Sequence, residues 1–289
     1  MYIYNVNHLK LFQPIKMKKN LFFAAAFMLF AGAAYAQGNT GTATQTGNDN
    51  DALITQVGKN NTASTTQVRN GNTAMQNQDG VNNAARINQN SSYDTPPNTN
   101  DHTQIQVGNN NSAVADVYNS DNYGFQEQDG NNNASQILQA GLGNNTKSIA
   151  TTYQEGNNNI AFIEQRGGGR NTAAIDQIGN SNEAYVKQDG NRNDADVDQD
   201  GNGNNLGSGK WSAADLGVRQ TGSDNYAKVD QFGNDNNALV SQDGNFNDGI
   251  VIQSGNMNEG IISQTGASHL STITQNGNHN TATVTQSNN

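Results

Sequence analysis

Hydrophobic and polar positions alternate along short segments of this chain, and the alternation restarts every eleven residues. In the stretch QFGNDNNALVSQDGNFNDGIVIQSGNMNEGIISQTG, glutamine recurs at Gln231, Gln242, Gln253 and Gln264, and glycine follows two residues after each. With this glutamine as position 0, Asn falls at +5, Ala at +7, Val or Ile at +9, and the next Gln at +11. These positions share one face of a β-strand, because successive side chains point to opposite sides.

The G-x-x-N segment between two such strands, for example Gly233–Asn236, predicts a tight turn. Gly and Asn both tolerate positive φ and sharp reversals of the chain. One strand and one turn make a unit of eleven residues, and two units make a flat rung of about 22 residues. Rungs stack about 4.7–4.9 Å apart through backbone hydrogen bonds. The sequence therefore predicts an all-β fold, a β-solenoid of stacked two-strand rungs with the cross-β spacing of amyloid. Roughly 21 strands in about ten rungs give a length of about 50 Å.

Stacking turns the inward positions into columns of identical side chains. A column of amides forms a ladder, because each amide donates to one neighbouring rung and accepts from the other. The predicted ladder residues are Gln177, Gln188, Gln199, Gln220, Gln231, Gln242, Gln253, Gln264, Gln275, Gln286, Asn182, Asn193, Asn225, Asn236, Asn247, Asn258 and Asn280. The predicted turn glycines are Gly179, Gly190, Gly222, Gly233, Gly244, Gly255, Gly266 and Gly277. Asn256 also falls in a turn, where we expect water to replace its contacts.

The eleven-residue spacing lengthens at four places, and insertions in solenoids map to surface loops. The predicted loops lie near residues 90–103, 140–152 and 202–217, and an extension of one residue falls at Gly167–Gly169. Pro96 and Pro97 fit a loop, because a central strand needs the backbone N–H that proline lacks.

The composition is polar, with 33% hydrophobic residues and no cysteine. Globular domains usually contain about 45–50% apolar residues, so a broad apolar core is not expected. A disordered, prion-like tract is the alternative for such a composition. The regular spacing favours the solenoid, because low-complexity chains rarely keep one phase over such a length.

Residues 1–36 differ from the rest of the chain. From Met17 the sequence reads MKKNLFFAAAFMLFAGAAYAQ, which has a basic start, an apolar run and small residues before Gln37. This pattern predicts a signal peptide over 1–36, with translation starting at Met17 and cleavage after Ala36. The solenoid is then predicted over 37–289, in a secreted protein.

Charge narrows the range of partners. Residues 1–36 contain four lysines and no acid, so their removal changes the net charge from −10 to −14. A strongly acidic chain disfavours nucleic acid and anionic membranes as partners. No later segment is apolar enough for membrane insertion.

Candidate chemistry is sparse, and we predict neither an enzyme nor a cofactor. Of the four histidines, His269 stands at a +5 position, where we interpret it as a substituted ladder residue. Asp196, Asp198 and Asp200, followed by glycine, match the opening of a calcium loop, but the closing glutamate of that motif is absent. Because these aspartates alternate along an outward strand face, we interpret them as a charged stripe that opposes premature stacking.

The pattern Q-x-G-x-x-N-x-A-x-x-x-Q, complete from Gln177 to Gln188, resembles the curlin repeat of curli amyloid subunits and covers nearly the whole chain after residue 37. The resemblance implies a secreted subunit that self-assembles into extracellular curli-like fibres for biofilm matrix, adhesion and surface attachment. It also implies a nucleator subunit and an outer-membrane secretion channel as partners. Two alternatives stay open: a minor nucleator of the same fibre, and a monomeric β-solenoid with a binding or adhesin surface.

Overall fold

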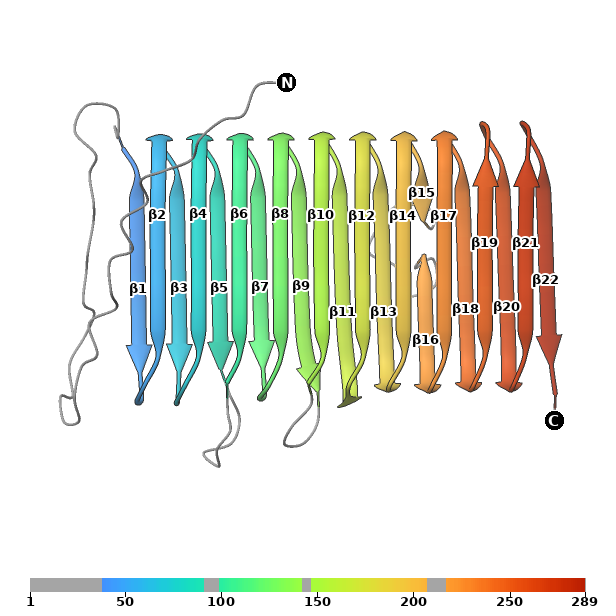
Figure 1. Cartoon of the computed structure of the whole chain (residues 1–289), viewed down its shortest axis with the longest axis horizontal. Helices are drawn as coiled ribbons and strands as arrows, with labels where there is room; N and C mark the ends of the chain where they lie inside the picture. The colour runs from blue at the N-terminus through green and yellow to red at the C-terminus, as the bar shows by residue number, and fades with distance from the viewer. Residues whose placement is uncertain (1–37, 91–98, 142–146, 207–216, 289) are drawn as a thin grey trace, which may run out of the picture.

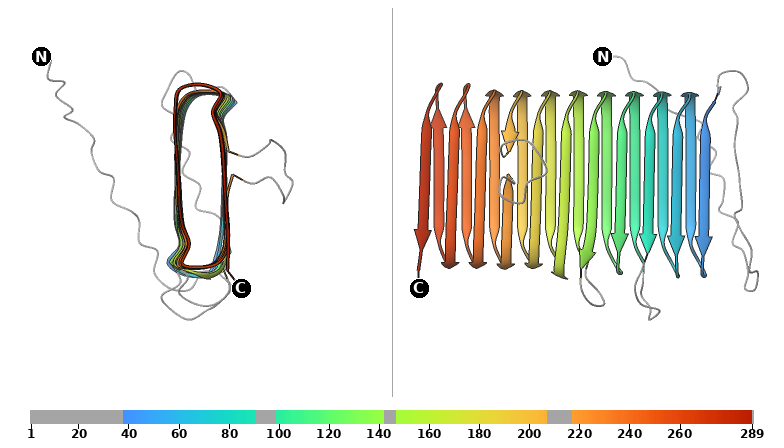
Figure 2. Two further views of the ribbon diagram at one scale, coloured as in Figure 1. Left: turned by 90° about the vertical axis from the view of Figure 1, so that its right-hand side faces the viewer. Right: turned by 180° about the vertical axis from the view of Figure 1, so that it is seen from behind.

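The computed structural model describes residues 38–90, 99–141, 147–206 and 217–288. These residues form an all-β solenoid of about ten turns, which confirms the predicted fold class. The strands lie side by side from β1 at one end to β22 at the other (Figure 1), and the end-on view shows superposed, flattened rungs (Figure 2). The described part of the chain has no helix with the length and hydrophobicity needed to cross a membrane.

Two parallel sheets form the long walls of the solenoid. The first sheet contains β1 Thr40–Thr46, β3 Thr62–Val68, β5 Ala84–Asn90, β7 Ser112–Tyr118, β9 Ala134–Gly141, β11 Ile160–Gly169, β13 Glu183–Asn191, β15 Asn205–Leu206, β16 Val218–Ser223, β18 Asn237–Asn245, β20 Glu259–Ala267 and β22 Thr281–Ser287. The second contains β2 Asp51–Lys59, β4 Thr73–Val81, β6 Asp101–Asn109, β8 Tyr123–Asn131, β10 Ile149–Asn157, β12 Thr172–Asn180, β14 Asp194–Asn202, β17 Tyr226–Asn234, β19 Asp248–Ser254 and β21 Leu270–Asn276.

The register places like residues on like residues, as the eleven-residue pattern requires. In the pair β18 and β20, Ala238 lies opposite Gly260, and Gln242 opposite Gln264. Inward residues such as Ala238, Val240 and Gln242 are buried, while the residues between them are partly exposed. The core is therefore a thin layer of stacked columns between the two sheets.

The lengthened units all affect the first sheet or the connection that leaves it. Longer connections join β5 to β6 and β9 to β10, and residues 207–216 separate β15 from β16. Strands β15 and β16 are pieces of one strand, because β18 pairs with both. The extension at Gly167–Gly169 is absorbed as a bulge in β11, where the register shifts between Arg166 and Gly169. The signal peptide over 1–36 stays a prediction, since these residues, like Pro96 and Pro97, lie outside the described part.

Candidate functional site: amide ladders and open sheet ends

The glutamines at position 0 form hydrogen-bonded columns in both sheets, unbroken in the second sheet and interrupted once in the first, at Val117. Gln242 Nε2 donates to Gln264 Oε1 at 3.0 Å, and Gln242 Oε1 accepts from Gln220 Nε2 at 3.0 Å. Gln242 Nε2 also donates to Tyr226 O, on the opposite sheet, at 2.8 Å. One buried side chain thus links three rungs of its own sheet and connects the two sheets.

Glutamines that neighbour each other in sequence alternate between the two columns. The column of the first sheet runs through Gln188, Gln220, Gln242, Gln264 and Gln286. The column of the second sheet runs through Gln177, Gln199, Gln231, Gln253 and Gln275. The part these residues play in assembly stays a prediction.

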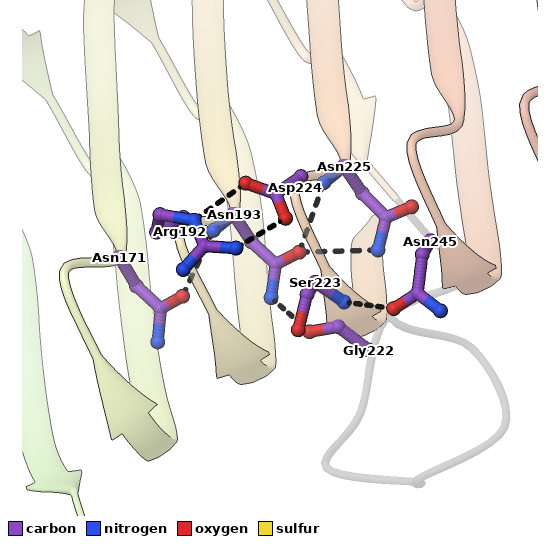
Figure 3. A network of polar contacts seen from close by, with 8 residues as sticks. All are labelled: Asn171, Arg192, Asn193, Gly222, Ser223, Asp224, Asn225 and Asn245. Carbon is purple, nitrogen blue, oxygen red and sulfur yellow. Dashed lines mark hydrogen bonds and ion pairs between the residues drawn. The ribbon is translucent and has the colours of Figure 1, made fainter.

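The asparagines at +5 stack in two further columns, but their main partners are backbone groups. Asn193 Oδ1 accepts from the backbone N of Asn225 at 3.1 Å and from its Nδ2 at 3.1 Å. Asn193 Nδ2 donates to Gly222 O at 3.0 Å (Figure 3). The same arrangement repeats through Asn182, Asn204, Asn236, Asn258 and Asn280, and through Asn225 and Asn247. The asparagine side chains therefore hold the turns of successive rungs together.

His269 occupies the last described place of one asparagine column. Its backbone N donates to Asn247 Oδ1 at 3.1 Å, as an asparagine there would. Its ring Nε2 lies 3.0 Å from Thr265 O.

The turn geometry refines the prediction in one respect. Glycine at +2 has positive φ, whether it lies inside the strand, as Gly233 does, or directly after it, as Gly255 does, and the next positive φ belongs to the residue at +4. That residue is Asp235 in one unit, Phe246 in the next and Met257 in the third, so its type varies widely. The asparagine at +5 does not have positive φ, and its side-chain hydrogen bonds explain its recurrence.

Glycine is required at +2 because the backbones of neighbouring rungs approach each other closely there. A Cβ on Gly233 would lie 2.2 Å from Gly255 O, and a Cβ on Gly255 would lie 2.0 Å from Gly277 O. The same contact, at 1.8 to 2.0 Å, would arise at Gly179, Gly190, Gly222 and Gly244. On Gly266 a Cβ would meet the side chain of Asn288, whereas on Gly277 it would meet only Asn280 Nδ2, at 3.5 Å.

A third set of amides forms an exposed row that the prediction missed. Side-chain hydrogen bonds of 2.9 to 3.1 Å connect Asn109, Asn131, Asn157, Asn180, Asn202, Asn234, Asn256 and Asn278. Asn256 lies between two strands, as expected, and its side chain bonds to the rungs on both sides, while the replacement of these bonds by water stays a prediction. The recurring Gly-Asn dipeptide after the second-sheet strands was the available signal.

The acidic residues of β14 lie on an outward face beside one lysine. Lys228 Nζ lies 3.6 Å from Asp196 Oδ2, 3.7 Å from Asp198 Oδ2 and 2.8 Å from Asp230 Oδ1. Burial, and then the neighbouring Asp196, raise the pKa of Asp198 to about 6. Among the described residues, no group of three or more His, Cys, Asp or Glu side chains is placed to hold a metal ion.

The two ends of the solenoid leave the ladders unfinished. Gln286 accepts from Gln264, and its Nε2 donates to Leu270 O at 3.1 Å, which leaves one amide proton without a partner among the described residues. At the other end Gln45 Nε2 donates to Gln67 Oε1 at 2.8 Å, and no described residue donates to Gln45 Oε1. In the second sheet Gln56 Oε1 likewise has no described donor, whereas Gln275 Nε2 already donates to Glu259 O at 2.8 Å and to Asn280 O at 3.0 Å. One end thus offers the free donor of Gln286, and the other offers two free acceptors.

Comparison with known proteins agrees with this architecture. A family model described as the curlin associated repeat matches residues 37–68, 168–201, 190–233, 212–244, 233–266 and 255–287. Together these matches cover more than half of the chain. A search of curated proteins finds no match.

Proposed function

The chain belongs to the curlin family, and from this premise we propose that it is a secreted structural subunit that assembles end to end into extracellular fibres. Such fibres would serve biofilm matrix, adhesion and surface attachment. The observation that carries the proposal is the complementarity of the two solenoid ends. A second copy that continues the solenoid would place the acceptor Gln56 Oε1 beside the free donor of Gln286, and Gln45 Oε1 beside Gln275 Nε2.

The end strands also match in sequence. The first sheet has eleven strand positions, because β15 and β16 share one, and the second has ten, so the position that follows β22 lies on the second sheet. The next subunit therefore enters rotated by half a turn about the fibre axis, with its β1 on β21 and its β2 on β22. TGTATQT of β1 then lies on LSTITQN of β21, so that Ala43 meets Ile273 inside. On the other side Val284 of β22 meets Ile54 of β2.

Edge strands normally carry features that prevent association, such as charged side chains, proline or bulges. Strands β1, β21 and β22 contain no charged residue and no proline. Strands deeper in the stack, such as β14 with its four aspartates, carry the charges instead. Open, neutral edges at both ends favour the addition of further copies.

A disulfide between subunits tests the register. The chain has no cysteine, and Thr44 of β1 and Thr274 of β21 are both exposed at the same position of their repeat unit. In a fibre their Cα atoms would lie about 4.8 Å apart, within the range that a disulfide spans. Oxidised fibres of the variant Thr44→Cys/Thr274→Cys should run as covalent multimers on a denaturing, non-reducing gel.

The matched control is Thr42→Cys/Thr274→Cys. Thr42 is offset by two residues, so its Cα would lie about 8 Å from that of Thr274, beyond disulfide reach. Equal cross-linking of the two variants, or a protein that remains monomeric at tens of micromolar, would contradict the proposal.

Export and partners rest on the family and on the sequence. The signal peptide at 1–36 would direct the chain out of the cytoplasm, an outer-membrane channel would secrete it, and a nucleator subunit would start the fibre. Fusing residues 1–36 to a reporter enzyme that is active only after export would test the first step. A reporter that stays inactive would refute it.

A further inference from the structure

His102 lies inside the solenoid, at a position where other strands carry a small residue. It occupies the +7 position of β6, between Ala74 on β4 and Gly124 on β8. The side chain is fully buried. Its Nε2 lies 3.0 Å from Oε1 of Gln139, on β9 of the opposite sheet.

Two compensating substitutions explain this histidine. Val117 stands on β7 where the column of the first sheet has glutamine, with Gln89 on one side and Gln139 on the other. The ladder is therefore broken there, and His102 supplies from across the core the hydrogen bond that Gln139 Oε1 lacks. Gly124 makes room, because a Cβ at that residue would lie 1.7 Å from the imidazole ring.

The contact fixes the protonation state of the ring. An amide oxygen only accepts, so Nε2 of His102 must carry the proton. Nδ1 is then an unprotonated nitrogen, and it has no hydrogen-bond partner among the described residues. Protonating Nδ1 would place a charge and an unsatisfied N–H in a site closed to water, which is unfavourable.

No charged group faces this ring to offset that cost. The inward residues of β4, β5, β7, β8 and β9 are Ala, Gly, Ser, Val, Ile and Gln. The charged side chains of β4 to β8 are Asp79, Arg86, Asp101, Asp116, Glu127 and Asp129, all at outward positions. Burial accordingly lowers the pKa of His102 from 6.5 to about 4, although the hydrogen bond that its Nε2 donates to Gln139 acts in the opposite direction.

The packing of the core also changes at these strands. A continuous apolar cluster begins at Ile137 on β9 and extends to β22. On the N-terminal side the core is mostly polar: Gln76 Nε2 donates to Gln104 Oε1 at 2.9 Å, and Gln104 Nε2 donates to Gln126 Oε1 at 2.8 Å. Coupling across β6–β9 therefore depends on hydrogen bonds, with little apolar packing to support them.

We propose that His102 makes β6–β9 an acid-sensitive joint, at which mild acid uncouples β1–β5 from the apolar-cored remainder of the solenoid. Because the proton binds better in the opened state, the closed state has its full stability above pH 6.5. That stability decreases as the pH falls and levels off below about pH 4. A pKa change from 6.5 to about 4 corresponds to a roughly 300-fold increase in the opening equilibrium constant. This inference concerns the fold of one chain and does not depend on fibre formation.

Amide hydrogen exchange of the full chain between pH 7 and pH 4, corrected for the intrinsic pH dependence of exchange, tests the joint. The triple variant His102→Ala/Val117→Gln/Gly124→Ala restores the regular unit, with an alanine column and an unbroken glutamine ladder. In the wild type, amides of β1–β5 should lose protection as the pH falls while those of β10–β22 keep it. The triple variant should keep protection throughout, and His279→Asn, which removes an exposed imidazole, should behave as the wild type does. Equal loss of protection in the wild type and the triple variant would overturn the proposal.

A second measurement needs no variant in the core. Nitrogen-15 NMR of histidine-labelled protein should show His102 as the Nε2–H tautomer, with a pKa well below the ordinary value of 6.5. A titration of His102 at that ordinary value would also overturn it.

Discussion

Replacing Gly277 with alanine tests end-to-end stacking, because this glycine has no neighbour on its C-terminal side within the chain. Each earlier glycine of the column lies against the carbonyl oxygen of the next, at about 2 Å from an added Cβ. A Cβ on Gly277 meets nothing closer than 3.5 Å. In the proposed fibre the next place in the column belongs to Gly47 of the next subunit, whose φ is also positive. The alanine should therefore fit in one chain and clash between chains.

Gly255→Ala is the matched control. The two glycines have φ values of +117° and +118°, so alanine brings the same backbone strain to both, about 1–3 kcal/mol. They differ in where the clash falls. A Cβ on Gly255 would lie 2.0 Å from Gly277 O, which belongs to the same chain. Relieving such a contact separates the strands by about 1 Å and breaks about three ladder hydrogen bonds and one amide bond, at about 1 kcal/mol each. A loss of about 3–4 kcal/mol raises the concentration needed for elongation roughly 100- to 1,000-fold.

The assay is elongation from preformed wild-type fibres, with hydrogen exchange on the soluble chains. Gly277→Ala should keep protected amides in β21 and fail to elongate, whereas Gly255→Ala should lose protection in β21. Because β1 and β2 of Gly277→Ala are unchanged, a small proportion of it should also stop wild-type growth by capping one end. Elongation of Gly277→Ala at the wild-type rate would refute stacking in this register.

Three further predictions concern the ladders and the acidic stripe. Gln242→Ala and Gln253→Ala each leave buried amides without partners, at a cost of about 1–3 kcal/mol. Both should lengthen the lag of assembly relative to Ser241→Ala, which changes an outward residue. Equal lags would contradict the assigned face. Asn256→Ala removes bonds to two rungs and should lower the free energy of unfolding by about 1–2 kcal/mol, measured by denaturant titration; an unchanged midpoint would show that water replaces the row. Because the pKa of Asp198 is raised to about 6, protonation favours the folded chain, and stability near β14 should rise as the pH falls from 7 to 4. Asp198→Asn should remove this rise, which is at most about 1 kcal/mol because the carboxylate is 43% exposed, and a pH profile unchanged by the substitution would refute the assignment.

The eleven-residue pattern was sufficient to predict the solenoid, because a period of two within each strand and a constant unit length determine which residues share a face. Gln242 and Gln264 are 22 residues apart in sequence and bonded in the structure, as two-strand rungs require. The turns were harder to predict, because the positive φ at +4 falls on whatever residue stands there, Phe246 and Met257 included. The role of the +5 asparagines depends on how the backbone crosses from one sheet to the other, which residue type alone does not reveal.

The contact between His102 and Gln139 was beyond sequence reasoning for another reason. The two residues are 37 positions apart and come from opposite sheets. Val117 and Gly124 each look like an isolated departure from the repeat. Only the structure shows that the three substitutions compensate one another in a single place.

The position of the lengthened units gives each subunit two unlike sides. Every repeat unit of the second sheet, and every connection leading from it to the first, keeps the regular spacing, whereas the departures occur on the first sheet and where the chain leaves it. Extra residues there shift no column, since the next strand resumes in register. The fold thus separates a constant side, which maintains the periodicity, from a variable side that accepts new sequence. A peptide grafted into the β5–β6 connection would be displayed once per subunit, about every 50 Å, on alternate edges of the fibre.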